Sequence, residues 1–380
     1  MTTLTTPTTG LSAAAPVWIE VDLTAIRHNY QQVRRHVGPR HSLLTVIKAN
    51  AYGHGLLPVA QALLAAGADL LGVASVAEGV ALRQAGVGGK IFVMGQLLSE
   101  EAPLIVAHDL TQAVSDEAGA LALSQAAALQ EKEVAVHLKV DTGMGRYGVW
   151  HEEAFPLFER LLQLPALKTE GVFTHLSSAG LSLHTTEEQL SRFNQFLAQL
   201  RQARLPAGIR HATNSIGLLK FPEARWDLVR TGLLIYGVSP IKEGQPLELK
   251  PALSLKSRVR FLKKIQPGQT VSYGGTWKAE RPTLVATVPV GYAHGYTRAL
   301  SNKAQLLIGG KRAAVIGRIT MEDLMVDVTD LPEVTLGDEV VLIGRQGGEI
   351  ITAEELARHA RTIPYEILVG LSPRIPRLYS

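Results

Sequence analysis

The 380-residue sequence contains no cysteine, which excludes disulfides, thiolate zinc sites and cysteine nucleophiles. It has little excess charge, because 38 Lys and Arg residues are opposed by 34 Asp and Glu residues and the net charge is +4. With 46% hydrophobic residues, this small charge excludes a chain that is disordered throughout. The basic residues are scattered rather than clustered, so we expect no nucleic-acid partner. The length predicts more than one domain.

Long hydrophobic runs are also absent. No stretch approaches the ~20 apolar residues that a membrane-spanning helix needs. Residues 1–16 are rich in Thr, Ala and Pro, and they lack the basic start and apolar core of a secretion signal. We therefore expect a disordered tail over residues 1–16, a cytoplasmic location and no membrane partner.

Downstream of the tail, short apolar segments alternate with longer segments of helical spacing. Eight of the short segments have strand character: 43–48, 70–75, 90–95, 110–115, 134–141, 170–176, 209–215 and 228–237. Eight strands alternating with helices predict an α/β fold, a (β/α)₈ TIM-type barrel, in a domain spanning residues 17–250. A doubly wound parallel sheet is the alternative, and the strand count favours the barrel.

Beyond this region the pattern changes to short strands joined by Pro-Gly, Gly-Gly and Gly-Asp turns. This pattern predicts a mostly β C-terminal domain over residues 251–380. Segment 17–23 is also strand-like and precedes the barrel strands, so it is a candidate to pair with that second domain.

Residues with useful chemistry stand where the predicted barrel strands end, which is where barrel enzymes carry their active sites. In chain order they are Lys48, Tyr52, Lys139, Arg146, His175, Asn214, Ser215, Arg230, Gly232 and Leu233. A lysine at such a strand end, with Tyr, Ser and Gly available for a phosphate, is typical of pyridoxal phosphate (PLP) enzymes, whose lysine forms a Schiff base. Each residue also has a structural interpretation, such as a helix cap for Ser215. Their joint placement at five strand ends favours a common site.

The sequence resembles the alanine racemase family of fold-type III PLP enzymes over residues 17–380, nearly the whole chain. Seven separated motifs carry the resemblance: VIKANAYGHG (46–55), HLKVDTGMGRYG (137–148), TNSIGLL (213–219), VRTGLLIYG (229–237), VPVGYAHGY (288–296), GRITME (317–322) and TIPYEIL (362–368). The first is shared by other PLP-binding barrels, and the complete set in this order is specific.

The resemblance implies that the protein interconverts L- and D-alanine by a two-base proton transfer on the PLP Schiff base, and that D-alanine is supplied for cell-wall synthesis. Lys48 would carry PLP and act as one base. Tyr292 of a second subunit would act as the other, which implies a homodimer with shared active sites. Arg230 would face the pyridine nitrogen, and His175 would link Arg230 to Tyr292.

The remaining roles that the resemblance implies concern cofactor and substrate binding. Arg146 would contact the cofactor's phenolic oxygen and the substrate carboxylate, to which Met321 of the other subunit would offer its backbone N–H. Lys139 matches a position that can be carbamylated. No metal is implied. The residues that would hold the phosphate end of the cofactor are Tyr52, Ser215, Gly232, Leu233 and Tyr365, and Asn214 is a further cofactor-binding residue.

Three positions depart from the family pattern. His294 replaces the common Asp in GYAHG, Glu322 replaces the usual Asp after Met321, and the LSSAG stretch after His175 lacks an Asp often found there. These departures bear on substrate range and turnover rather than on reaction type.

Three alternatives remain at the level of sequence. A PLP-binding barrel without catalysis would resemble only the barrel half of this chain. A fold-type III amino-acid decarboxylase would share the domain order, but typically uses a partner-subunit cysteine that is absent here. A racemase of another small amino acid, such as serine, would share the motifs.

Overall fold

The computed structural model describes residues 15–241 and 247–380, so residues 1–14 of the expected N-terminal tail lie outside it. The chain divides into two compact units. Residues 26–51 and 56–249 form the first, which we call the barrel unit. The second, which we call the β unit, contains residues 15–25, 52–55 and 250–380.

The barrel unit is built on eight parallel strands, as the alternation of apolar segments predicts. Their order in the sheet is β10-β2-β3-β4-β5-β6-β8-β9, with a short strand β7 (Val149–Trp150) paired to β6. The eight strands are β2 (Ser42–Val46), β3 (Leu70–Val73), β4 (Lys90–Val93), β5 (Thr111–Val114), β6 (Val134–Asp141), β8 (Leu167–Phe173), β9 (Ile209–His211) and β10 (Leu228–Thr231).

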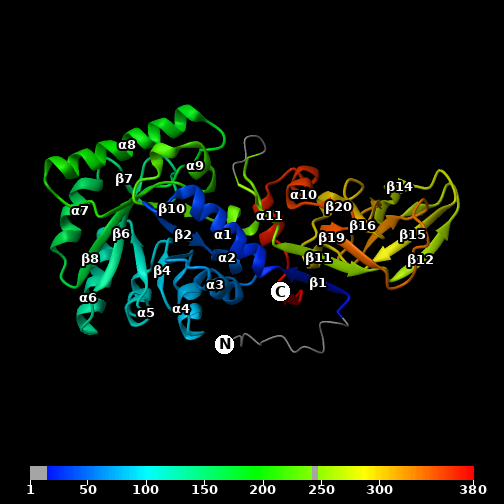
Figure 1. Cartoon of the computed structure of the whole chain (residues 1–380), viewed down its shortest axis with the longest axis horizontal. Coiled ribbons are helices and arrows are strands. Elements are labelled where there is room, and N and C mark those ends of the chain that lie inside the picture. Colours follow the sequence, from blue (N-terminus) through cyan, green and yellow to red (C-terminus); the bar gives the residue numbers. More distant parts are fainter. Residues whose placement is uncertain (1–14, 242–246) are drawn as a thin grey trace. The chain divides into compact units, whose positions relative to one another are not determined.

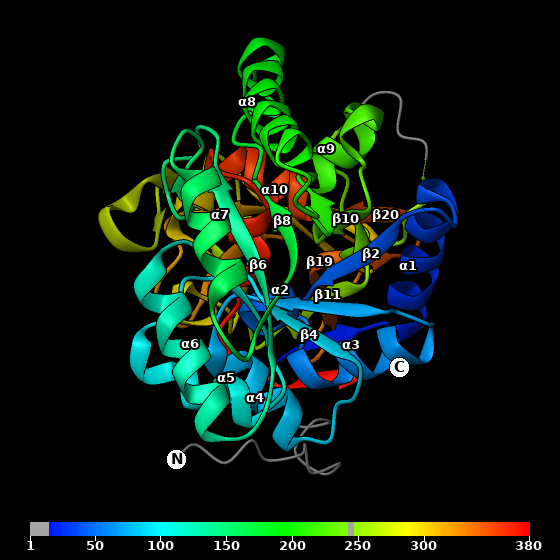
Figure 2. The same ribbon diagram turned by 90° about the vertical axis from the view of Figure 1, so that its left-hand side faces the viewer.

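Helices surround these strands (Figures 1 and 2). They are α1 (Leu23–Val37), α3 (Leu56–Ala65), α4 (Val76–Gln84), α5 (Ala102–Ala107), α6 (Glu117–Leu129), α7 (Ala154–Gln163), α8 (Leu183–Gln202) and α9 (Ser215–Lys220), with 3₁₀ turns η1 (Ser99–Glu101), η2 (Pro222–Ala224) and η3 (Leu233–Tyr236). Side-chain caps start several of them: Ser75, Asp116, Ser182 and Asn214 each accept a backbone N–H of the first helical turn.

The two end strands of the sheet, β9 and β10, are joined by side chains. Asp227, just before β10, accepts hydrogen bonds from the backbone N–H of Arg210 at 2.8 Å and from its Nε at 2.7 Å. The Asp227 N–H donates to the Arg210 carbonyl at 3.1 Å. Further along the same two strands, Arg230 Nη2 donates a hydrogen bond to the carbonyl of Ala212, just after β9, at 2.9 Å. The closing seam of the barrel therefore depends on Asp227 at one end and Arg230 at the other.

The β unit contains a sheet in the order β12-β15-β18-β17-β16-β19-β11-β1-β21, with β20 paired to β19. Strand β1 pairs antiparallel with β11 and parallel with β21. The strands of this sheet are β1 (Val17–Val21), β11 (Leu253–Arg258), β12 (Phe261–Ile265), β15 (Thr283–Val288), β16 (Gln305–Ile308), β17 (Lys311–Ile316), β18 (Leu324–Asp327), β19 (Glu339–Gln346), β20 (Glu349–Ile351) and β21 (Arg377–Tyr379). Strands β13 (Thr270–Val271) and β14 (Trp277–Lys278) form a separate two-stranded sheet.

The β unit also carries helices, and the apolar faces of its strands form a core of their own. The helical segments are α10 (Ala353–Ala360), α11 (Pro364–Val369), η4 (Tyr273–Gly275), η5 (Tyr292–His294) and η6 (Arg298–Leu300). One cluster of buried side chains packs Ile265, Val271, Val285 and Ile316 together. The prediction of a mostly β second domain is thus confirmed, with two α-helices added.

Several predicted strands end earlier in the structure than their apolar runs do. The apolar runs at 43–48, 209–215 and 228–237 form strands only over residues 42–46, 209–211 and 228–231. The chain then turns into α2 (Lys48–Tyr52), α9 and η3. At α9 the Asn214 side chain accepts the first N–H groups of the helix and so ends the strand. None of the helices in the described stretches is long and apolar enough to cross a membrane.

Candidate active site

Lys48 begins a turn of unusual backbone. Ala49, Asn50, Ala51 and Tyr52 have φ between 52 and 53°, so α2 is a left-handed turn, which L-residues adopt at a cost of about 1–2 kcal/mol each. Hydrogen bonds within the barrel unit hold it: the Ala51 N–H donates to the Ile47 carbonyl at 2.8 Å. Strained backbone persists only where the surrounding structure holds it in place, and such strain is typical of functional sites. The turn gives Lys48 one fixed exit direction from strand β2.

Glu78 of α4 holds the same turn from the side. Its carboxylate accepts the Ala49 N–H at 2.6 Å and the Ala74 N–H at 2.8 Å, and so ties together the loops that follow β2 and β3. The carboxylate also interacts electrostatically with Lys48. Sequence reasoning missed Glu78, because its position in a helix after the next strand gives no local signal.

Lys48, Lys139 and Arg146 form a group of cations in the barrel unit. Burial and then the Arg146 charge lower the pKa of Lys48, so more of its amine is neutral near pH 7. Burial and then the charges of Arg146 and Arg230 lower the pKa of Lys139 to about 8. The positive charge of this group favours the binding of an anion. The lowered pKa values mean that the two lysine amines lose a proton more easily than an exposed lysine does.

The loop after β6 is shaped by one carboxylate. Asp141 accepts the backbone N–H groups of Gly143, Met144 and Gly145, each at 2.8 Å. Because three successive donors converge on Asp141, the chain leaves the strand in a tight turn that ends at Arg146. Gly143 and Gly145 have φ of 132 and 67°, a region that favours glycine.

Arg230, in β10, lies buried at the centre of a hydrogen-bond network. Its Nη2 donates to the Thr174 carbonyl at 2.9 Å and to His175 Nδ1 at 3.2 Å, and its Nη1 donates to His211 Nδ1 at 2.8 Å. Burial lowers the pKa of Arg230 to about 9, which leaves the guanidinium protonated at neutral pH. Burial and Arg230 hold the pKa of His175 well below its usual range, so the ring is neutral. Since His175 Nδ1 accepts, its proton is on Nε2.

A set of neutral donors lies at the ends of β9 and β10. Ser215, which is buried, begins α9 after the Asn214 cap, and its Oγ accepts the Gly232 N–H at 3.1 Å. Leu233 follows at the start of η3. Hydroxyl and backbone N–H donors at the ends of the last two barrel strands match the usual phosphate site of this architecture.

Two predicted residues, Tyr52 and Tyr365, meet in the β unit. Their ring centroids are 5.8 Å apart. Burial raises the pKa of both phenols, so both hydroxyls stay protonated and can donate to an anion.

Tyr292 and Met321 also meet in the β unit, and both side chains are about half exposed. The Tyr292 N–H donates to the Thr320 carbonyl and the Ala293 N–H to the Met321 carbonyl, each at 3.0 Å. A methyl group on Gly291 would lie 2.3 Å from the Met321 carbonyl oxygen, so only glycine permits this approach.

Two of the departures from the family pattern also lie together. His294 Nε2 is 3.7 Å from Glu322 Oε2. An Asp at position 294 would face Glu322 with like charge, and histidine removes that repulsion. Burial lowers the pKa of His294, against the opposing charge of Glu322.

These residues fit PLP by the chemistry of their donor sets. The barrel unit supplies a lysine amine of lowered pKa and neutral donors for the phosphate of the cofactor. It also supplies cations for the ring oxygen of the cofactor and for the carboxylate of the substrate. A barrel with a lysine at the end of its first strand and neutral donors at the ends of its last two strands has the features of barrel-type PLP enzymes.

Comparisons with known proteins identify the family. Residues 21–240 match the family described as "Alanine racemase, N-terminal domain" and residues 252–379 match "Alanine racemase, C-terminal domain". The chain therefore belongs to the alanine racemase family, which is PLP-dependent.

Relatives of known name agree over the full length. The chain is 46% identical over 371 residues to the alanine racemase of Symbiobacterium thermophilum, covering 97% of this chain and 98% of the relative. It is 42% identical over 366 residues to that of Halothermothrix orenii, covering 96% and 97% of the two chains. The crystal structure of alanine racemase from Streptomyces lavendulae superposes with a TM-score of 0.91 at 36% identity, covering 96% of this chain and 97% of that chain.

Proposed function

We propose that the protein interconverts L- and D-alanine with PLP held covalently by Lys48. The observation that carries the proposal is the partly buried Lys48 at the end of β2, next to a strained left-handed turn and within the fields of Arg146 and Lys139, in a chain of the alanine racemase family. Bound PLP withdraws electrons from the amino acid's α-carbon and makes its proton acidic. We expect Arg146, together with the Met321 N–H of a second copy, to hold the substrate carboxylate.

Two bases on opposite faces of the substrate would exchange the α-proton. Lys48 serves one face, and its lowered pKa leaves part of the amine neutral and able to take the proton. Tyr292 of a second copy serves the other face in this proposal. The neutral His175 ring carries its proton on Nε2, so it would donate to the phenol oxygen and stabilise the phenolate.

The cofactor's two ends would be held differently. Arg230 can only donate, so it would give a hydrogen bond to the pyridine nitrogen and leave that nitrogen unprotonated. The phosphate would be held by Ser215, after the Asn214 cap, by the backbone at Gly232 and Leu233, and by Tyr52 and Tyr365.

Lys139 is proposed to be carbamylated by carbon dioxide. Its pKa of about 8 leaves a fraction of neutral amine, which adds to carbon dioxide and releases one proton. The resulting anion would lie among the charges of Arg146, Arg230 and Lys48 that already influence the Lys139 amine. A carbamate resonance in ¹³C NMR after exposure to ¹³C-bicarbonate, absent in Lys139→Met, is the expected result.

Four further proposals concern the homodimer, the domain boundary, the cellular location and the use of the product. A homodimer with shared sites is supported by the exposure of Tyr292 and Met321, which need cover to act in catalysis. A domain boundary near residue 250 is supported by family matches that end at 240 and resume at 252. Cytoplasmic location and supply of D-alanine to the cell wall stay predictions, which cell fractionation and D-alanine auxotrophy on gene deletion would test.

The central experiment incubates the protein with PLP and L-alanine or D-alanine and resolves the enantiomers. We expect racemisation from either side and a loss of at least roughly 10²-fold in Lys48→Ala. Lys264→Ala, which removes an exposed lysine of β12, is the matched control and should retain activity. Racemisation of serine in preference to alanine, or release of carbon dioxide, would replace the proposal with one of the alternatives.

A further inference from the structure

A line of side chains passes from Arg230 through the barrel interior, away from the rim. Arg230 Nη1 donates to His211 Nδ1 at 2.8 Å, and His211 Nε2 lies 2.9 Å from His137 Nδ1. Beyond them, His137 Nε2 is 4.0 Å from Glu170 Oε2. The exposed fractions of His211 and His137 are 0% and 3%. Neither histidine is needed by the proton transfer itself.

Hydrogen-bond chemistry gives this line a single direction. Arginine has no acceptor, so His211 Nδ1 must accept and His211 must carry its proton on Nε2. That proton is donated to His137 Nδ1, so His137 in turn carries its proton on Nε2. The His137 Nε2–H then faces the Glu170 carboxylate, at a distance where charge attracts it without a direct hydrogen bond. A cation at one end and an anion at the other both favour this direction.

The surroundings keep both rings neutral, which the direction requires. Phe173 stacks on His211 with centroids 4.7 Å apart, and Phe92 lies 4.9 Å from the His137 ring. Burial lowers the pKa of His137 to about 4, against the opposing charge of Glu170, and burial with Arg230 holds the pKa of His211 well below its usual range. The other charges that act on His137 are those of Lys90 and Arg230, and both lower its pKa further.

The strand that carries Glu170 is irregular at this point. Residue Val136 of β6 is opposite Thr169, but the next residue, His137, is opposite Gly171, so Glu170 is an extra residue in a β-bulge. Bulges re-aim side chains near active sites. A methyl group on Gly171 would lie 2.8 Å from His137 Nδ1 and 2.4 Å from the Ile209 carbonyl oxygen, so glycine makes room for the ring.

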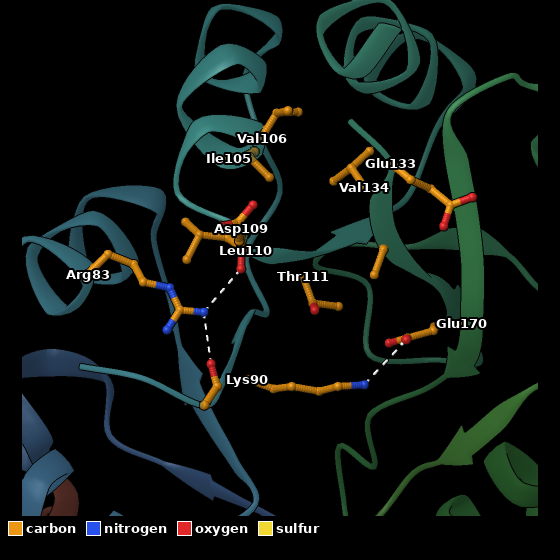
Figure 3. Close-up of a pocket in the computed structure, with 12 residues that line it drawn as sticks. Arg83, Lys90, Ile105, Val106, Asp109, Leu110, Thr111, Glu133, Val134 and Glu170 are labelled. Carbon is orange, nitrogen blue, oxygen red and sulfur yellow. Dashed lines mark hydrogen bonds and ion pairs between the residues drawn. The ribbon is translucent and has the colours of Figure 1, made fainter. Parts of the chain in front are cut away.

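The Glu170 end opens into a cavity of about 310 Å³ near the amino ends of β4, β5 and β6 (Figure 3). Lys90 extends across it and pairs with Glu170 Oε1 at 3.3 Å. Lys168 pairs with the same oxygen at 3.5 Å. These cations hold the pKa of the Glu170 carboxyl below its usual range, so the anion is present at neutral pH.

We propose that His211 and His137, with Glu170 beyond them, are positioning residues for racemisation: they form a one-way hydrogen-bond relay that holds Arg230 as a donor in one orientation. Its catalytic consequence rests on the proposed function, in which Arg230 faces the cofactor ring. The direction of the relay does not, because it follows from the protein's own groups. A relay that reversed would place an N–H of His211 against an N–H of Arg230, and the guanidinium would turn away.

The direct test is ¹⁵N NMR of histidine-labelled protein at pH 7, with and without PLP. Signals are assigned by their loss in His137→Gln and His211→Gln. We expect both rings neutral, with the proton on Nε2, in both samples. Either ring found as imidazolium, or with its proton on Nδ1, would overturn the proposal, whatever the catalytic activity proves to be.

The kinetic test compares two variants at one position. Glutamine at position 137 keeps an oxygen that accepts from His211, whereas phenylalanine fills the space without one. We expect His137→Phe to lower kcat by roughly 10- to 100-fold with KM within about twofold, and His137→Gln to recover most of the loss. PLP content and the visible spectrum of each variant separate this effect from loss of cofactor.

A control and two decisive outcomes complete the comparison. His184→Gln, on the exposed face of α8, should leave kcat unchanged. Equal losses in His137→Phe and His137→Gln would show that position 137 only fills space, and would overturn the proposal. If His137→Phe does not fold, the wild-type NMR result decides. Failure of the proposed function would appear instead as racemisation that survives Lys48→Ala.

Discussion

Lys139 illustrates how burial among like charges sets the chemistry of single residues. Its side chain is 5% exposed and faces Arg146 and Arg230, while Asp141 compensates only in part. The folded protein therefore holds the Lys139 proton less tightly than the unfolded chain does, with a pKa of about 8 against an ordinary 10.5. Burial and a neighbouring cation also lower the pKa of Lys48, which leaves more of its amine unprotonated and available to accept a proton.

The first prediction follows from that difference in proton affinity. Because the pKa of Lys139 is lower in the folded state, its cost to stability is fully present below pH 8 and declines as pH rises from about 8 to 10.5. Without bicarbonate or PLP, we expect Lys139→Met to raise the free energy of unfolding by about 1–3 kcal/mol at pH 7, and by less at pH 10. Urea unfolding at both pH values measures this. Lys168→Met, exposed on β8, should show no such trend, and a gain that grows with pH would contradict the prediction.

At the scale of elements, the left-handed turn α2 carries strain that serves Lys48. Four consecutive residues have positive φ, although only glycine adopts this region without cost. Glu78 supports the turn from outside by accepting the Ala49 N–H. Within the turn, Asn50 Oδ1 accepts the Leu56 N–H at 2.8 Å and so ties the turn to the start of α3. The free energy that the turn costs is offset by the packing of the surrounding barrel.

We expect Ala49→Gly to relieve part of that strain. Ala49 is exposed, so the substitution removes little packing and should stabilise the protein by about 0.5–1 kcal/mol in urea unfolding. Ala122→Gly, at a partly exposed position in the middle of the right-handed helix α6, is the control and should destabilise by about 1 kcal/mol. Equal destabilisation by both variants would mean that the turn is not strained.

At the scale of the whole molecule, the proposed active site requires two copies of the chain. Lys48 belongs to the barrel unit and Tyr292 to the β unit, where its side chain is 44% exposed. In a two-fold dimer, each site would combine Lys48 of one copy with Tyr292 of the other. The β unit then has a catalytic purpose.

Complementation tests this assembly. Lys48→Ala and Tyr292→Phe should each have low activity alone, and a refolded equal mixture should recover about a quarter of wild-type activity, since half the dimers are hybrids with one intact site of two. Light scattering should report a dimer. Tyr273→Phe, an exposed tyrosine of the β unit, is the control for Tyr292→Phe and should be fully active. A mixture no more active than its components would place both bases in one chain.

The sequence alone determined the barrel, the second β unit and the rim position of Lys48, because hydrophobic period and turn residues are local properties that act along the chain. It could not reveal the left-handed turn after Lys48, the bulge at Glu170 or the contact between His137 and His211, which are 74 residues apart. Those features depend on strand register, and register is set by packing over the whole barrel. Tertiary structure therefore decided which histidines are buried and neutral and in which direction their hydrogen bonds run. It also decided how each charge shifts the pKa values of its neighbours.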